Sequence, residues 1–239
     1  YKPAISTGYH TNKSPDQLAT ATAEEMALEL RAEIQTFSSM KSIDERNQVV
    51  ETTSGKLKYA KLVLATGARC IELPIAGNGL ESVYSINNLM DYSTFRQAME
   101  GKKHVLIIGG GLIGSEYAND LIQSGYEVTV VDPLPSILGT LMPKVASDSV
   151  KNALENAGVQ FHFETVVEKI ENQATGVKAT LASGKEVNAD IVLSAVGVRP
   201  DLTLAKTAGL QTNRGIITDR SLKTSASNIY ALGDCAEVD

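Results

Sequence analysis

The clearest pattern of hydrophobic and polar positions lies near the middle of the chain. Residues 104–108 form an almost unbroken apolar run, as long as a buried strand. Leu112–Ser124 alternates apolar and polar positions at helical spacing, and Gly125 follows, a residue type that commonly ends helices. A second predicted strand, Glu-Val-Thr-Val-Val, occupies 127–131. The pattern predicts a strand–helix–strand unit of a parallel α/β sheet.

Glycines stand at fixed spacing where the first predicted strand meets the helix. The Gly-x-Gly-x-x-Gly pattern consists of Gly109, Gly111 and Gly114. In this context the first glycine allows a tight turn, the second lets a pyrophosphate approach the backbone, and the third lets helix and strand pack closely. We predict a dinucleotide site in which the helix N-terminus, including Leu112 and Ile113, holds the phosphates.

An acidic residue directly after the second strand narrows the choice of dinucleotide. Asp132 stands 18 residues after Gly114, where a carboxylate accepts hydrogen bonds from a ribose and repels a 2′-phosphate. No Arg or Lys follows until Lys144. The sequence therefore favours NAD(H) over NADP(H).

Two parts of the chain resemble each other. Residues 54–67 and 183–197 both begin with Ser-Gly-Lys and continue into a buried strand that ends near glycine. The elements predicted before them also correspond: a helix at 23–32 or 145–156, then strands at 34–37 and 48–53 or at 159–171 and 176–182. Such a repeat predicts two similar domains in tandem.

The first copy has no strand–glycine–helix unit before it, so we expect the chain to begin inside a dinucleotide-binding domain. The strand predicted at 228–232, followed by Gly233 and Asp234, is expected to return to that domain as an added parallel strand. We predict an α/β fold of two Rossmann-like three-layer dinucleotide-binding domains: an incomplete one, 1–101 with 219–239, and an NAD(H)-binding domain, 102–218.

Composition excludes several classes of protein. The 239 residues include 22 basic and 28 acidic ones, a net charge of −6, which argues against nucleic-acid binding. No apolar run is long enough to span a membrane. The two cysteines lie far apart, with no metal-ligand spacing, and favour a reducing, cytoplasmic setting.

Several motifs together resemble a known family, the FAD-dependent pyridine-nucleotide oxidoreductases with two dinucleotide-binding domains. They are Ala65-Thr-Gly67, Gly109–Glu116, Ala195-Val-Gly-Val-Arg-Pro200 and Asn228–Asp234. The sequence lacks the amino-terminal flavin glycine motif and the carboxyl-terminal interface domain of that family. We therefore expect this chain by itself to hold FAD poorly and to be inactive.

The resemblance implies that the incomplete domain, 1–101 with 219–239, is the FAD-binding domain, and it implies roles for individual residues. Lys2 and Glu116 would lie at the junction of flavin and nicotinamide, as a coupled cation and anion. The other positions that it implies for cofactor binding are Met40, Thr66, Gly67, Arg69, Val196, Gly197, Gly233 and Asp234.

The resemblance also implies a reaction. NADH would reduce FAD, and because no cysteine pair follows Tyr1, electrons would leave the flavin directly for rubredoxin or a similar iron–sulfur electron-transfer protein. The alternatives are a related NADH oxidase or nitrite reductase flavoprotein, and a non-catalytic NADH-binding module that senses redox state.

Overall fold

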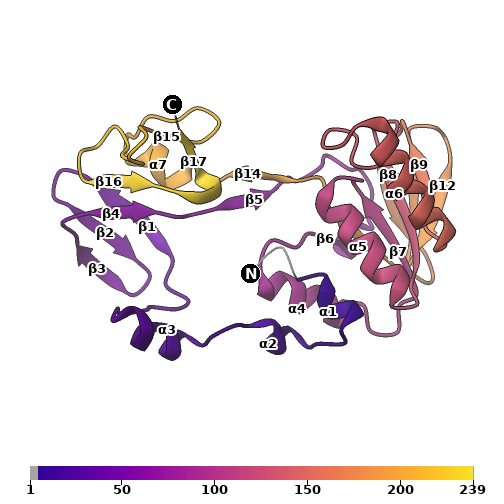
Figure 1. Cartoon of the computed structure of the whole chain (residues 1–239), viewed down its shortest axis with the longest axis horizontal. Coiled ribbons are helices and arrows are strands. Elements are labelled where there is room, and N and C mark those ends of the chain that lie inside the picture. The colour runs from indigo at the N-terminus through magenta and orange to yellow at the C-terminus, as the bar shows by residue number, and fades with distance from the viewer. Residues whose placement is uncertain (1–4, 239) are drawn as a thin grey trace. The chain divides into compact units, whose positions relative to one another are not determined.

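The computed structural model describes residues 5–238, which divide into two compact units. The first contains the chain up to Thr20 together with Cys70–Gly197 (Figure 1). The second contains Ala21–Arg69 together with the chain from Val198. Each unit is therefore assembled from two separate stretches of sequence. No helix within the described part of the chain is long and apolar enough to cross a membrane.

The first unit is built on a five-stranded parallel sheet with the order β6-β13-β7-β8-β9. These strands are Val83–Tyr84, Ile191–Ser194, His104–Ile108, Glu127–Asp132 and Gln160–Phe163. Helix α5 (Leu112–Gln123) connects β7 to β8, and α6 (Lys144–Asn156) connects β8 to β9. The predicted strand–helix–strand unit is thus confirmed and lies at the centre of the sheet.

Alternate residues of β7 enter two different hydrophobic clusters, which explains its continuous apolar run. Val105 and Ile107 pack with α5, whereas Leu106 and Ile108 pack with an antiparallel meander on the other face. The meander consists of β10 (Val167–Asn172), β11 (Val177–Leu181) and β12 (Glu186–Ala189). The unit therefore has three layers: helices, parallel sheet and meander.

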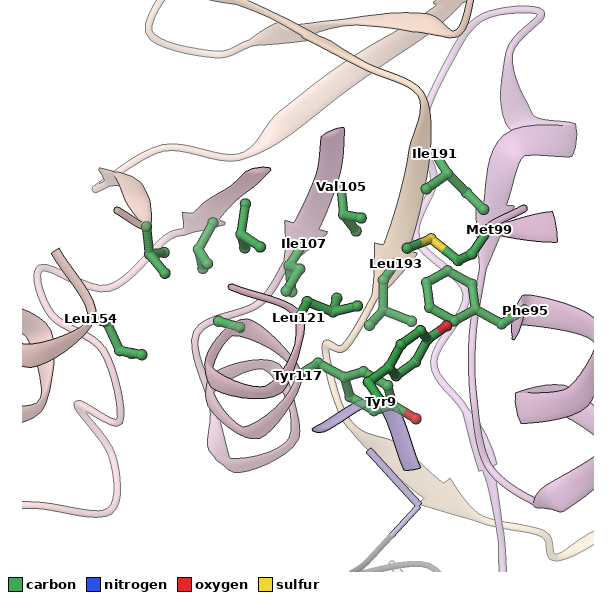
Figure 2. Packing of buried hydrophobic residues seen from close by; sticks show 14 of the residues in the cluster. Tyr9, Phe95, Met99, Val105, Ile107, Tyr117, Leu121, Leu154, Ile191 and Leu193 are labelled. Carbon is green, nitrogen blue, oxygen red and sulfur yellow. The ribbon is translucent and has the colours of Figure 1, made fainter. Parts of the chain in front are cut away.

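The helical side of the sheet holds an aromatic core. Figure 2 shows Tyr117 of α5 and Leu193 of β13 beside Phe95 and Tyr9. Phe95 comes from α4 (Leu89–Ala98) and Tyr9 from α1 (Thr7–His10), which is followed by α2 (Pro15–Leu18). The start of the described chain is therefore packed into the first unit.

The second unit repeats the meander with β1 (Met40–Asp44), β2 (Val49–Thr52) and β3 (Gly55–Lys58). The remaining pairs are β4 (Leu62–Leu64) with β16 (Ile229–Ala231), β15 (Ile216–Thr218) with β17 (Ala236–Val238), and β5 (Ala68–Cys70) with β14 (Val198–Pro200). Its helices are α3 (Ala23–Leu30) and α7 (Thr203–Thr207). The parallel pairing of β4 with β16 confirms that the late strand returns to the early part of the chain.

The α/β class is confirmed, with two local corrections. Residues 34–37 were expected to form a strand, but Phe37 has a φ of 55° within a turn, and the strand forms at Met40–Asp44. The strand predicted over 159–171 is two strands, because Glu164 has a φ of 56° and ends β9 before β10 begins. Left-handed backbone at a non-glycine residue cannot continue a strand.

The compact units do not divide at the predicted boundaries of 101/102 and 218/219. Residues 70–101 lie in the first unit, where β6 pairs with β13. Residues 198–218 lie in the second, where β15 pairs with β17. The sequence could not show these pairings, because short apolar strands carry no mark of their partner. Which cofactor each unit takes stays a prediction.

Candidate functional site

The glycine-rich turn after β7 has no room for side chains at two of its glycines. A Cβ atom on Gly114 would lie 1.9 Å from the carbonyl oxygen of Gly109. Gly109 itself has a φ of 107°, and its Cβ would lie 2.6 Å from the carbonyl oxygen of Ala195. These glycines let the start of α5, the end of β7 and the segment after β13 come into close contact.

Gly111, in contrast, faces open space. A Cβ built there would have no atom outside its neighbours within 4 Å. Gly111 is also the N-cap of α5, and no side chain caps the helix. Because the first N–H groups of a helix have no partner inside it, this end carries unused donors and a partial positive charge. The turn thus exposes bare backbone where an anion can approach.

The carboxylate of Asp132 is fixed beside this turn. One oxygen accepts a hydrogen bond from the Gly110 N–H at 2.5 Å, and the other accepts one from the Leu134 N–H at 2.7 Å. The residue is only 7% exposed. Since an ionised carboxylate can accept about four hydrogen bonds, each oxygen keeps one acceptor position. Asp132 is therefore oriented by backbone and still able to bind a hydroxyl group.

A cavity of about 360 Å³ lies over the turn, entirely within the first unit. Of the predicted residues it is lined by Gly109, Gly111, Leu112, Ile113, Asp132, Val196 and Gly197. Gly110 and Ala195, which lie within the quoted motifs, also line it, and so do four residues that the sequence did not indicate: Pro133, Leu134, Gly139 and Thr140. These four come from the segment after β8, whose proximity to the turn depends on tertiary contacts rather than on a motif.

Glu116 lies one turn further along α5 and lines a second cavity, of about 420 Å³. Ser6 and Thr7 line the same cavity, and Leu112 borders both cavities. Burial, and secondarily the negative charge of Asp120, raise the pKa of the Glu116 carboxyl above its ordinary value. Lys2, the predicted partner of Glu116, lies outside the described residues.

In the second unit, two predicted segments follow neighbouring parallel strands. Thr66 and Gly67 come after β4, whereas Gly233 and Asp234 come after β16. The carboxyl ends of parallel strands lie at the same sheet edge, where ligands of open α/β sheets bind. Gly67 and Gly233 have φ values of 65° and 73°, so both strands turn sharply there. The structure therefore brings these four residues to one edge.

The other two predicted residues of this unit have partners in the protein. Arg69 binds Asp201, with its Nε at 2.8 Å and a terminal nitrogen at 2.7 Å from one carboxylate oxygen. Met40 is half-buried at the start of β1, where it pairs with Thr52 and packs against the core of the unit. The sequence did not indicate either contact. Asp201 is distant from Arg69 along the chain, and no motif marks the pairing of Met40 with Thr52.

Comparison with known proteins gives the family. The model of the pyridine nucleotide-disulphide oxidoreductases matches residues 1–239. The chain belongs to this family. A pyridine nucleotide-disulphide oxidoreductase is expected to have paired dinucleotide-binding units, and the meander that occurs in both units agrees with that expectation.

Relatives within and near this family align along the whole chain. The rubredoxin-NAD(+) reductase of Alcanivorax borkumensis is 47% identical over 99% of the chain and 62% of its own length. The nitric oxide reductase FlRd-NAD(+) reductase of Aliivibrio fischeri is 34% identical over 100% of the chain and 62% of its own length. The chain thus spans about three fifths of the curated relatives that it matches.

Solved structures agree with the fold. The ferredoxin reductase for the CYP199A2 system from Rhodopseudomonas palustris superimposes with a TM-score of 0.91 at 32% identity, covering 99% of this chain and 59% of that one. Putidaredoxin reductase, in its covalent complex with putidaredoxin, gives a TM-score of 0.89 at 28% identity, covering 99% and 58%.

Proposed function

We propose that this chain forms part of an NADH-dependent flavoprotein reductase that passes electrons from NADH through FAD to rubredoxin or a similar iron–sulfur electron-transfer protein. The observation that carries the proposal is the glycine turn of the first unit. Gly109, Gly111 and the adjacent Asp132 line one cavity, and the absence of a side chain at Gly114 lets α5 begin close to that cavity.

Each part of that cavity matches a part of NAD(H). The free N–H groups at the start of α5, near Leu112 and Ile113, would hold the pyrophosphate. Asp132 would accept hydrogen bonds from the hydroxyls of the adenosine ribose. Val196 and Gly197, after β13, line the same cavity and would contact the cofactor from the neighbouring strand. The carboxylate disfavours a 2′-phosphate, so NADH is the proposed reductant.

The second unit offers a place for FAD at the edge formed by β4 and β16. Asp234 would accept a hydrogen bond from the sugar-like chain of the flavin, while Thr66, Gly67 and Gly233 would present backbone to it. When bound, FAD would accept two electrons as a hydride and release them singly. Met40 and Arg69 remain proposed cofactor contacts, Arg69 with Asp201 as its partner in the structure.

Glu116 and Lys2 are the residues proposed to act closest to the chemistry. Glu116 is partly shielded from water in a cavity separate from, but adjoining, the glycine cavity. An acid there can hold the ammonium of Lys2, and that ion pair would change when negative charge develops on the flavin. We propose that the pair orients the reacting rings rather than binding the phosphates.

The names of the relatives support an iron-protein acceptor. The two curated relatives described above are reductases of rubredoxin and of flavorubredoxin, and the solved relatives include ferredoxin and putidaredoxin reductases. The two cysteines of this sequence form no Cys-x-x-Cys pair. Direct transfer from flavin to a one-electron acceptor therefore agrees with the sequence better than transfer through a thiol pair. The cytoplasmic location stays a prediction from the same cysteine content.

The test is steady-state reduction of rubredoxin by NADH with the full-length protein. The expected result is NADH-dependent reduction that needs bound FAD and that Gly111→Val abolishes without loss of the folded state by circular dichroism. Ferredoxin, oxygen and nitrite are offered in parallel. Faster turnover with oxygen or nitrite than with rubredoxin would replace the proposal by the oxidase or nitrite reductase alternative. NADH binding without bound flavin would instead favour the non-catalytic sensing module.

A further inference from the structure

The segment after β8 lines one side of the cavity over the glycine turn, and a buried hydroxyl is hydrogen-bonded to this segment. Residues 133–143 run from β8 to α6 and contribute Pro133, Leu134, Gly139 and Thr140 to the cavity. We propose that Ser147, on α6, is a positioning residue for the adenosine end of the NADH site. This inference rests on the proposed function, because it assigns a role in binding the same cofactor.

Ser147 is completely buried, and its hydroxyl contacts the segment directly. It donates a hydrogen bond to the carbonyl oxygen of Ile137, in the middle of the segment. Ser147 itself does not line the cavity. Since a buried carbonyl without a donor is unfavourable, this contact fixes the segment against α6 rather than leaving it free to shift.

The next residue connects the segment to the glycine turn. The Leu138 N–H donates to the carbonyl oxygen of Gly110 at 2.7 Å. Leu138 is buried and has a φ of 55°, a left-handed conformation that a leucine adopts only when its surroundings require it. The strained residue thus lies directly between the bond to Ser147 and the bond to Gly110.

Gly110 in turn is hydrogen-bonded to the carboxylate of Asp132. Its N–H donates to Asp132 at 2.5 Å, and the Leu134 N–H, from the start of the same segment, donates to the other oxygen at 2.7 Å. Ser147, Ile137, Leu138 and Gly110 therefore form a continuous series of contacts that ends at the proposed ribose acceptor. The nicotinamide half of the cofactor is not expected to depend on this series.

The experiment compares Ser147→Ala with Ser149→Ala in the full-length protein. Ser149 lies on the same helix and is exposed, and its hydroxyl donates to the carbonyl oxygen of Val145 in the preceding turn. We expect Ser147→Ala to raise the Kd for NADH about tenfold, the effect of one buried hydrogen bond. The Kd for reduced nicotinamide mononucleotide, which has no adenosine half, should stay unchanged, and so should the flavin reduction rate at saturating NADH. Ser149→Ala should match the wild type throughout.

A purely structural role would give a different result. Ser147→Ala would then lower the melting temperature but leave the Kd for NADH unchanged, or weaken both nicotinamide compounds equally; either outcome would overturn the inference. Ser147→Cys keeps the volume and a weak donor, so it provides the same comparison if the alanine variant does not fold, with a smaller expected rise in Kd. Failure of the wild type to bind NADH would remove the proposed function and the inference together, whereas wild-type binding with unaltered variants removes the inference alone.

Discussion

The backbone N–H of Gly110 donates a hydrogen bond to the carboxylate of Asp132, 2.5 Å away. This contact joins the turn after β7 to the end of β8, two segments that the sequence motif specifies separately. It also fixes the direction of the acid without using all of its acceptor positions. The first prediction concerns what this fixed charge does to cofactor choice.

Replacing Asp132 by Ser should narrow the preference for NADH over NADPH. The substitution removes the charge that would repel a 2′-phosphate and replaces the two carboxylate oxygens, the acceptors for the ribose, by one neutral hydroxyl. We expect kcat/KM for NADH to fall and its ratio to that for NADPH to fall by about tenfold or more, the loss of one charge-assisted hydrogen bond. Steady-state kinetics with both cofactors measures this ratio. A wild-type protein that uses NADPH as well as NADH would contradict the assignment of Asp132.

Adding a methyl group should weaken NADH binding at one glycine of the turn and lower the stability of the protein at another. Gly111→Ala places its Cβ in open space, so the melting temperature should stay the same while NADH binds more weakly. Gly114→Ala places its Cβ against the backbone of Gly109, and overpacking of this kind costs about 1–3 kcal/mol. Thermal unfolding and NADH titration of both variants check the prediction. Equal melting temperatures for the two variants would show that the close approach at Gly114 is unimportant.

The strand–glycine–helix unit could be predicted because all of its determinants are local. Its glycines, apolar run and late acid lie within one short stretch, and Gly109, Gly111 and Asp132 do line one cavity. The pairing of β4 with β16 was also predictable, since the strand at 228–232 had no place in the second repeat.

The remainder depends on contacts that leave no local pattern. Ser147 looks like any polar residue of an amphipathic helix, yet it is completely buried. Asp201 gives no sign in the sequence that it holds Arg69. The strand expected at 34–37 was wrong because β-type residues there do not outweigh the left-handed turn at Phe37. Tertiary structure decides each of these cases.

The ion pair of Arg69 and Asp201 should contribute little to stability. The Arg69 side chain is 72% exposed, and exposed pairs contribute about 0–1 kcal/mol. Arg69→Ala should therefore leave the free energy of unfolding within about 1 kcal/mol of the wild type. If Arg69 also contacts FAD, the same variant should hold flavin less tightly, measured by absorbance after dialysis. Unchanged flavin content would limit Arg69 to its pairing with Asp201.

The raised pKa of Glu116 predicts a pH-dependent effect of Glu116→Gln on stability. Burial and Asp120 make the folded protein keep this proton to a higher pH than the unfolded chain does. Folding stability from this group is therefore lost as pH rises from the unfolded pKa, about 4.3, through the raised folded value. In the Lys2→Met background, which removes the proposed ion pair, Glu116→Gln should raise the melting temperature at pH 7, and the difference should vanish near pH 3.5. A difference that is constant with pH would contradict the shift.

Asp120→Asn provides the matched control for this pH effect. It removes the neighbouring negative charge while leaving Glu116 in place, so part of the pKa shift should disappear. The effect of Glu116→Gln at pH 7 should then be smaller in the Asp120→Asn background than in the wild type, since the two residues are coupled.

Stopped-flow kinetics separates a role of Glu116 in the reaction from a role in docking. Glu116 lines a different cavity from the glycine turn, so the ribose and phosphates of NADH are expected to bind elsewhere. In the full-length protein, Glu116→Gln should slow flavin reduction by NADH in stopped-flow experiments more than it raises the Kd. Gln123→Ala, an exposed change near the end of the same helix, should alter neither value. An unchanged reduction rate with a higher Kd would make Glu116 a docking residue.

The partnership with Lys2 is tested by the same measurement in a double-mutant cycle. If Lys2 and Glu116 act as one ion pair, Lys2→Met should slow reduction in the wild type but have much less effect once Glu116 is Gln, because the interaction is already lost. Independent, additive effects on the rate would contradict the pair while leaving a separate role for each residue. The coupling free energy of the two residues is the difference between the effect of Lys2→Met in the wild type and its effect in the Glu116→Gln variant. It therefore decides whether a cation from the start of the chain and an acid on α5 meet at the site of hydride transfer.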